Sequence, residues 1–210
     1  MLILVRGQIG GVIPSSFGKL KNATFLELGN NEFEGAIPAS VENMTKLQHF
    51  LGYRNQFVRS VPEFTHCNKM TDISLYRNNL SWELPSFSIL VVYNNHLSGP
   101  LPPDFSATPN LIYFLAHNND FSGTLSPTLF DLNSITHVML SGNANLKVAL
   151  PTVLSTPSLT SLVIEGCSFT GPLHATITSP LASLYLAGNN FSSSIPLLPP
   201  TITDVSLAYN

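Results

Sequence analysis

Histidine and cysteine are the side chains of this chain that could bind a metal ion or take part in catalysis. Six histidines and two cysteines occur among 210 residues, but none forms an HxxxH or HExxH pattern. Cys67 and Cys167 show no paired spacing, and serine, aspartate and histidine are scattered without a nucleophile motif or a glycine-rich phosphate loop. We therefore expect no enzymatic activity, no metal and no cofactor.

Tyrosine and arginine indicate a different chemistry, the recognition of a partner. Four rings recur two residues before successive repeat positions, and an arginine directly follows the first two of them. Tyr and Arg are the side chains most often found as binding hot spots. The predicted ligand-binding residues are Tyr53, Arg54, Tyr76, Arg77, Tyr93, Tyr113, His117 and His137, with His49, Tyr113 and His137 on the opposite flank. Strand propensity alone would also favour such tyrosines, so the row has a purely structural explanation as well.

These residues belong to an internal repeat. Segments such as GNNEFEGAIP (29 to 38) and YNNHLSGPLP (93 to 102) place Asn, an apolar residue, Gly, another apolar residue and Pro at one set of offsets. The aligned positions are Gly7, Asn31, Asn55, Asn78, Asn95, Asn119, Asn143, Cys167, Asn189 and Asn210. The pattern predicts a single domain of about ten coils over residues 1–210.

The pattern around each aligned position predicts one short strand per coil. Apolar residues alternate before it, as in Leu184 and Leu186 before Asn189, which is typical of a strand with one buried face. The turn that follows leaves backbone groups which water cannot reach, and an amide side chain can satisfy both the donors and the acceptors. We therefore predict an asparagine ladder, in which Cys167 substitutes as a small buried weak donor.

Glycine and proline divide each coil after the ladder position. Glycines such as Gly35 and Gly123 permit a positive φ, prolines such as Pro38 end the segment, and stretches such as PTLFDLNSI have room for one short helical turn. Asn78 and Asn95 are only 17 residues apart, so we expect no outer helix in that coil. Trp82 is expected to fill the space that the missing helix leaves.

The consensus LxxLxLxxNxLxGxIP resembles the plant-type leucine-rich repeat over nearly the whole chain. The resemblance implies an α/β solenoid, a right-handed superhelix with a parallel β-sheet on its concave face and short 3-10 or irregular turns on its convex face. Related chains are the ectodomains of plant receptor-like kinases and receptor-like proteins. Copies such as SGPLPPDF and SGTLSPTLF are also similar to the repeats of kinetoplastid surface antigens.

Composition restricts the classes of partner. The chain is 44% hydrophobic, only 10% charged and has a net charge of −3 without a Lys/Arg run, so we expect no nucleic-acid binding. No stretch approaches the roughly 20 apolar residues of a membrane span, so this segment is not expected to insert into a membrane itself. Paired-cysteine caps are absent from the sequence, and we expect both ends to be truncated or uncapped.

Four sequons, at Asn22, Asn43, Asn79 and Asn190, are candidate glycosylation sites. The last two arise from the repeat consensus, whereas Asn22 and Asn43 precede strands and are the stronger candidates. Several coils at roughly 4.8 Å each separate the two cysteines, beyond the ~7 Å limit for a disulfide. We therefore predict two free thiols.

The leading hypothesis is a noncatalytic recognition module that binds a protein, peptide or glycan on its concave face. It would be part of a secreted or cell-surface protein, with a membrane-anchored parent, and the cytoplasm is the alternative location. Two other hypotheses stay open: a structural glycoprotein coat or surface antigen without a dedicated ligand, and an enzyme-inhibitor protein.

Overall fold

The computed structural model describes residues 1–59, 61–62, 64, 66–67, 69–80, 89–173, 176–192 and 195–210. The chain forms two compact units, unit 1 (Met1–Leu97) and unit 2 (Ser98–Asn210), and each is described by itself. Trp82, Pro85 and Ser81 of the third sequon lie outside the described residues.

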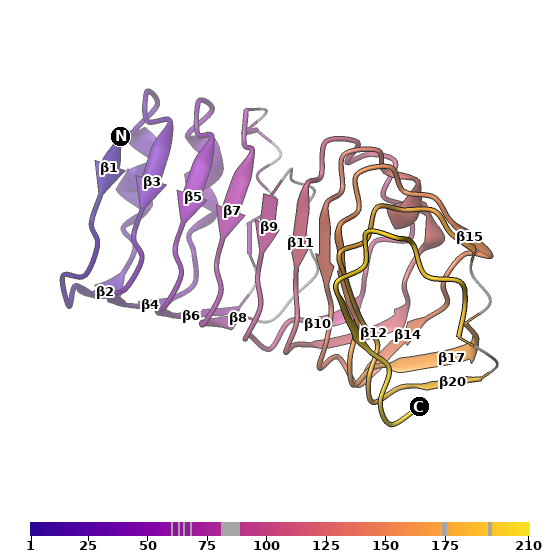
Figure 1. The fold of residues 1–210 in the computed structure, drawn as a ribbon. Coiled ribbons are helices and arrows are strands. Elements are labelled where there is room, and N and C mark those ends of the chain that lie inside the picture. Colours follow the sequence, from indigo (N-terminus) through magenta and orange to yellow (C-terminus); the bar gives the residue numbers. More distant parts are fainter. Residues whose placement is uncertain are drawn as a thin grey trace. The chain divides into compact units, whose positions relative to one another are not determined.

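The main sheet of unit 1 is built from the strands that precede the ladder positions. Its parallel strands pair in the order β1 (Leu2–Ile3), β3 (Phe25–Glu27), β5 (His49–Leu51), β7 (Asp72–Ser74) and β9 (Ile89–Val91) (Figure 1). The central residues Leu26, Phe50, Ile73 and Leu90 are in register and buried. Because alternate residues point to opposite faces, the residues on either side of each central one face outward.

The segment after each ladder position of unit 1 forms a second parallel sheet, here called the lateral sheet, which the sequence analysis did not predict. Its strands are β2 (Gly10–Val12), β4 (Glu32–Gly35), β6 (Gln56–Arg59) and β8 (Asn79–Leu80). The 3-10 helices η1 (Ser15–Lys19) and η2 (Ala39–Asn43) follow and lie behind the main sheet in Figure 1. The predicted short helical turns are thus confirmed.

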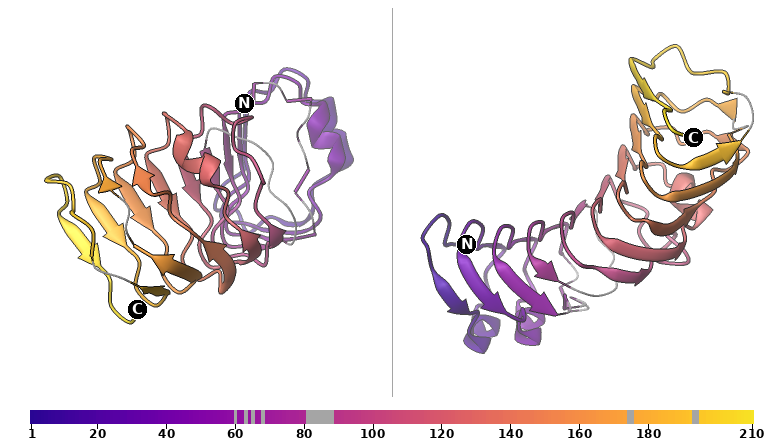
Figure 2. Two further views of the ribbon diagram at one scale, coloured as in Figure 1. Left: turned by 90° about the vertical axis from the view of Figure 1, so that its right-hand side faces the viewer. Right: turned by 90° about the horizontal axis from the view of Figure 1, so that it is seen from below.

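Unit 2 repeats this arrangement (Figure 2). Its main sheet has the order β11 (Tyr113–Leu115), β13 (His137–Met139), β16 (Ser161–Val163), β19 (Ser183–Tyr185) and β21 (Asp204–Ser206). Its lateral sheet has the order β10 (Ser98–Pro100), β12 (Asp120–Thr124), β14 (Asn145–Val148), β17 (Ser168–Pro172) and β20 (Asn190–Ser192). Strands β15 (Val153–Leu154) and β18 (Thr176–Ile177) form a further pair, and η3 (Pro127–Asp131) is a 3-10 helix. The predicted leucine-rich-repeat solenoid is therefore the fold of both units.

The ladder asparagines hydrogen-bond to two coils at once. Asn143 is fully buried; its Nδ2 donates to the carbonyls of Leu140 in its own coil (2.7 Å) and Ala116 in the preceding coil (3.2 Å), while its Oδ1 accepts from the Phe121 N–H (3.1 Å). A donation to the carbonyl three residues earlier is common to Asn31, Asn55, Asn78, Asn95, Asn119, Asn189 and Asn210. Each amide therefore satisfies backbone groups that are otherwise shut off from water.

Cys167 occupies the ladder position of its coil with a thiol in place of an amide. Its Sγ donates to the carbonyl of Leu140 in the preceding coil (3.3 Å). The Oδ1 of Asn189 in the next coil accepts the N–H groups of both Cys167 and Phe169, each at 3.2 Å, as the Oδ1 of Asn31 accepts those of Gly7 and Ile9. Burial raises the pKa of the Cys167 thiol, which keeps it protonated as a donor.

The repeat glycines adopt the left-handed conformation that the consensus requires. Their φ values are 85° at Gly11, 71° at Gly35, 90° at Gly99, 74° at Gly123 and 93° at Gly171. Arg59, which stands at the same repeat position, keeps a φ of 67°. In the part of the chain that the structure describes, no helix has the length and apolar character needed to cross a membrane.

Candidate recognition surface

The three predicted tyrosines of unit 1 form one continuous stack. The ring centroids of Tyr53 and Tyr76 are 5.1 Å apart with an interplanar angle of 3°, and those of Tyr76 and Tyr93 are 4.6 Å apart at 12°. Each follows a main-sheet strand, so the spacing of the strands sets the spacing of the rings. Such stacked pairs contribute about 0.5–1.5 kcal/mol each beyond the area that they bury. We call Tyr53, Tyr76 and Tyr93 the tyrosine stack.

The stack begins on the backbone of Gly29, which occupies the same repeat position one coil earlier. Gly29 is buried, and a β-carbon built on it would lie 2.4 Å from the ring of Tyr53. The hydroxyl of Tyr53 donates to Oε1 of Glu27 (3.1 Å). Because both faces of the Tyr76 ring are covered by neighbouring rings, a ligand would meet ring edges and hydroxyl groups.

The phenols of Tyr53 and Tyr93 stay protonated at neutral pH. Burial raises the pKa of Tyr53, and its hydrogen bond to Glu27 raises it further. Burial also raises the pKa of Tyr93, although the positive charges of Arg77 and Arg54 act in the opposite direction. Both hydroxyls are therefore available as hydrogen-bond donors over the whole physiological pH range.

The residue directly before each ladder position, here called the turn position, adopts a left-handed conformation. In unit 1 the φ values are 56° at Arg6, 52° at Asn30, 51° at Arg54, 56° at Arg77 and 54° at Asn94. The bend aims the backbone N–H at the next coil, as where Arg54 donates to the carbonyl of Tyr76 (2.9 Å). Arg54 and Arg77 were predicted to belong to the binding surface, but the left-handed conformation of the turn position was not predicted. The signal for it in the sequence is that most other turn positions carry Asn or Gly.

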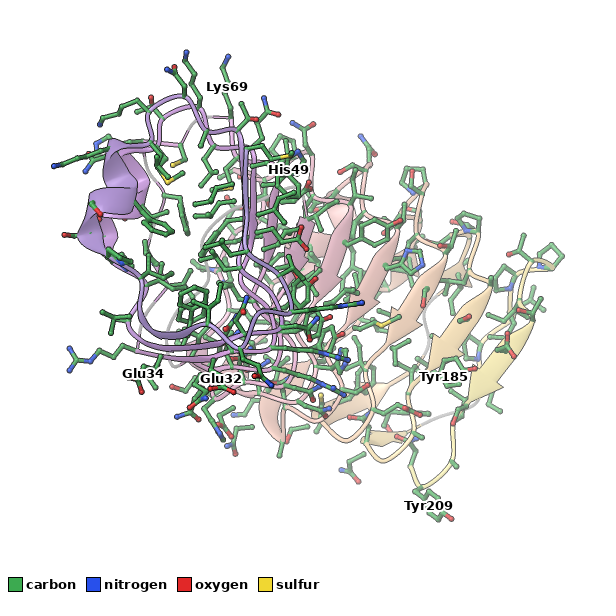
Figure 3. The ribbon with its side chains drawn as sticks, turned by 90° about the vertical axis from the view of Figure 1, so that its left-hand side faces the viewer. Glu32, Glu34, His49, Lys69, Tyr185 and Tyr209 are labelled. Atoms are coloured by element: carbon green, nitrogen blue, oxygen red, sulfur yellow. The ribbon has the colours of Figure 1, made fainter. Side chains whose placement is uncertain are left out.

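A second cluster lies on the opposite flank of the main sheet of unit 1. The rings of Phe25 and His49 are 5.4 Å apart at 48°, and Nδ1 of His49 contacts Oδ2 of Asp72. The three residues share one register position on β3, β5 and β7. In Figure 3 His49 and Lys69 lie at one edge of the unit, whereas Glu32 and Glu34 lie at the other. His49 was predicted on this flank, but Asp72 was not, although it occupies the same repeat position.

The remaining predicted ligand-binding residues belong to unit 2. Tyr113 and His137 are in register on β11 and β13, with ring centroids 5.0 Å apart at 46°. His117 is half-buried at the coil position that the tyrosines occupy in unit 1, and burial lowers the pKa of its imidazole, which keeps it neutral at pH 7. The structure therefore brings together Tyr53, Tyr76 and Tyr93 within unit 1 and Tyr113 and His137 within unit 2.

All four sequon asparagines are exposed. Asn22 Oδ1 accepts a hydrogen bond from Lys46 Nζ (2.9 Å), and the carbonyl of Asn43 accepts one from Lys21 Nζ (3.1 Å). Asn79 and Asn190 begin the lateral strands β8 and β20. Their accessibility permits glycosylation, which stays a prediction.

The other His, Cys, Asp and Glu side chains form no metal-binding cluster in the described ranges. No group of three or more His, Cys, Asp or Glu side chains among the described residues could hold a metal ion. Both cysteines are free; Cys67 is buried, and desolvation raises the pKa of its thiol to about 11. This thiol is therefore a structural donor, to the carbonyls of Glu42 and Met44 (both 3.5 Å).

Comparisons with known proteins agree with this architecture. No family model matches the sequence. Receptor-like protein 39 of Arabidopsis thaliana is 29% identical over 103 residues, which are 44% of this chain and 12% of that protein. The crystal structure of a TDR receptor superposes with a TM-score of 0.86 at 23% identity, covering 96% of this chain and 37% of that one. The ectodomain of the Arabidopsis receptor kinase HAESA, solved with an N-terminally extended IDA peptide hormone, has a TM-score of 0.75 at 29% identity, covering 100% of this chain and 41% of that one.

Proposed function

We propose that this chain is a leucine-rich-repeat protein of the plant type and a noncatalytic recognition module that binds a peptide or protein segment on the outward face of the main sheet. The observation that carries the proposal is the tyrosine stack. Its rings are already held parallel, at 3° and 12°, before any ligand arrives. A surface that is ordered in advance loses little conformational entropy on binding, which favours affinity.

The stack supplies both apolar area and directed hydrogen bonds. Ring edges carry partial positive charge and the hydroxyls donate, so the surface suits backbone carbonyls and other electronegative groups of an extended chain. Arg54 and Arg77 are exposed and directly follow two of the tyrosines. The HAESA ectodomain, 29% identical to this chain, was solved with a peptide ligand, which supports a peptide rather than a glycan as the first class to test.

The extracellular side of a membrane is the proposed location, with this chain as part of a longer anchored protein. The similarity to Receptor-like protein 39 and to receptor ectodomains supports this assignment.

Expression through a eukaryotic secretory pathway should yield a protein whose mass falls on glycosidase treatment. Replacing Asn22 and Asn43 together by Gln should remove most of that mass change.

Selection from a phage-displayed random peptide library tests the proposed function. Selected peptides should bind the Tyr76→Ala/Arg77→Ala variant at least tenfold more weakly, since hot-spot truncations cost about 2 kcal/mol or more. The matched control is Tyr185→Ala/Lys147→Ala, which removes an outward tyrosine and one positive charge from unit 2. Equal losses in both double variants would remove the tyrosine stack from consideration, and a failure to enrich any peptide would favour a coat protein without a dedicated ligand.

A further inference from the structure

Three of the turn positions of unit 1 carry arginine, a residue that the local backbone does not favour. Arg6, Arg54 and Arg77 have φ values of 56°, 51° and 56°, in the left-handed region where Gly and Asn are the usual residues. In unit 2 the turn positions are Asn118, Gly142, Gly166, Gly188 and Tyr209. Arginine in the left-handed conformation is therefore a feature of unit 1 and not of the repeat, and strained residues of this kind cluster at functional sites.

The three guanidinium groups are exposed and lack an ionic partner. Among the described residues, no carboxylate oxygen lies within 4.0 Å of any of them. We call Arg6, Arg54 and Arg77 the arginine column. Nη1 of Arg54 donates a hydrogen bond to Oδ1 of Asn30, at 3.5 Å. Like charges on nearby coils repel one another, so the column lowers its electrostatic energy when an anion binds.

The column borders an open depression at the end of the main sheet. Arg6, Gln8, Asn30 and Arg54 line it, together with Glu32 and the ladder residue Asn31. Arg6 and Arg54 stand on the coils to either side of Asn30, so their turns are roughly 10 Å apart. Two arginine side chains can close on one small group across that distance. The Arg54 side chain donates a hydrogen bond to Oδ1 of Asn30. The NH2 group of the Asn30 side chain can therefore donate to a ligand.

We propose that this depression binds a single oxyanion, a sulfate, phosphate or carboxylate group carried by the ligand. Arg6 and Arg54 supply guanidinium donors from two sides, and the amides of Asn30 and Gln8 supply neutral donors. Planar guanidinium groups match the geometry of such oxyanions. The carboxylate of Glu32, which also lines the depression, offsets one of the two positive charges, which favours one isolated oxyanion over a polyanionic chain.

The inference rests on the proposed function, because the depression adjoins the tyrosine stack. Arg54, which lines the depression, directly follows Tyr53, and the charge of Arg6 acts on the Tyr53 phenol. The ligand would therefore be a segment that lies along the tyrosines and places one oxyanion beside Tyr53.

Anion binding to the whole chain tests the proposal without knowledge of the natural ligand. The probes are inorganic sulfate, inorganic phosphate and acetate, each compared with chloride at constant ionic strength by calorimetry and thermal unfolding. Wild-type protein should bind at least one probe and unfold at a higher temperature in its presence. A response to sulfate or phosphate but not acetate assigns a tetrahedral anion, and the reverse assigns a carboxylate.

The variant Arg6→Asn/Arg54→Asn separates loss of the site from loss of the fold. Asparagine tolerates the left-handed turn, so this variant should unfold at an equal or higher temperature in chloride while binding the probe at least tenfold more weakly. Lys19→Ala/Lys21→Ala changes the net charge equally and should keep the wild-type response. Equal losses in the two double variants, or no difference between the probes and chloride in the wild type, would overturn the oxyanion site.

The two proposals fail in different experiments. Peptide binding that depends on Tyr76 and Arg77, without any anion response, would overturn the oxyanion site and keep the recognition module. An anion response that depends on Arg6 and Arg54, without any enriched peptide, would keep the site and overturn peptide recognition.

Discussion

Units 1 and 2 build the same turn after each main-sheet strand but place different side chains on it. Unit 1 presents Tyr53–Arg54 and Tyr76–Arg77, whereas unit 2 presents Ser141–Gly142 and Ala187–Gly188 at the same positions. Lys147 is the only Lys or Arg beyond residue 97. The left-handed backbone that both units share at the turn position is what the repeat requires. Arginine is less stable than glycine in that conformation, so unit 1 departs there from the most stable residue type.

The ladder is the part that the two units share, and its removal should have the largest effect. Asn143→Ala leaves the Phe121 N–H without a partner. It also removes one of the two donors to each of the carbonyls of Ala116 and Leu140, which keep the bonds from Asn119 Nδ2 and Cys167 Sγ. The unsatisfied N–H costs roughly 1–3 kcal/mol and each of the two lost hydrogen bonds about 0.5–1.5 kcal/mol, so unfolding in urea should show a loss of about 2 kcal/mol or more. Asn55→Ala should weaken unit 1 in the same way.

The control for the ladder is Asn145→Ala, two residues further along and exposed on β14. This change should alter the free energy of unfolding by less than about 0.5 kcal/mol. If Asn143→Ala costs no more than the control, hydrogen bonding does not explain the ladder.

Gly29→Ala tests the base of the tyrosine stack and should have the second largest effect. The new β-carbon would meet the Tyr53 ring at 2.4 Å, so the free energy of unfolding should fall by about 1–3 kcal/mol. Ser141 and Ala187 show that a β-carbon is acceptable at this repeat position in unit 2, so the cost arises from the ring. In the Tyr53→Ala background the same substitution should cost far less; an undiminished cost would place the strain in the backbone.

Exchanging residues at the turn positions should change stability in opposite directions in the two units. Arg77→Gly relieves a left-handed arginine and should stabilise the protein by about 0.5–1 kcal/mol, after the entropy cost of glycine. Gly166→Ala should destabilise it by about 1 kcal/mol, because Gly166 has a φ of 60° while its β-carbon would meet open space. Chemical denaturation of both variants measures the difference, and changes of the same sign would contradict the conformational argument.

The smallest expected effect is on the free energy of unfolding at alkaline pH, and it arises from unit 1 alone. The pKa of Tyr53 is raised in the folded state by burial and by Glu27. The unfolded chain therefore loses this proton first, near pH 10, and the stabilisation is complete below that pH and disappears as pH rises through the higher folded pKa. Tyrosinate absorbance should show this delayed ionisation in the wild type. Tyr53→Phe should flatten the fall of stability above pH 10, and an unchanged slope would remove Tyr53 as its cause.

Much of the architecture could be predicted because it depends on local pattern. The alternation around Leu184 and Leu186 indicated a strand, and PTLFDLNSI indicated the turn that is η3. The lateral sheets could not be predicted in this way, because segments such as Phe33–Gly35 become strands only when the next coil supplies backbone partners. The Asp72 contact with His49 was missed for the same reason, since it joins residues 23 positions apart.

The sequence by itself determined the repeat, the burial of its apolar positions and the amides of the ladder, because each of these follows from residue type at a fixed spacing. Only the tertiary structure decided that three tyrosine rings lie parallel and that Arg6 and Arg54 border one depression around Asn30. Those relations depend on how far apart the coils stack and on the left-handed bend after each strand. Both are set by hydrogen bonds between coils, which no single coil contains.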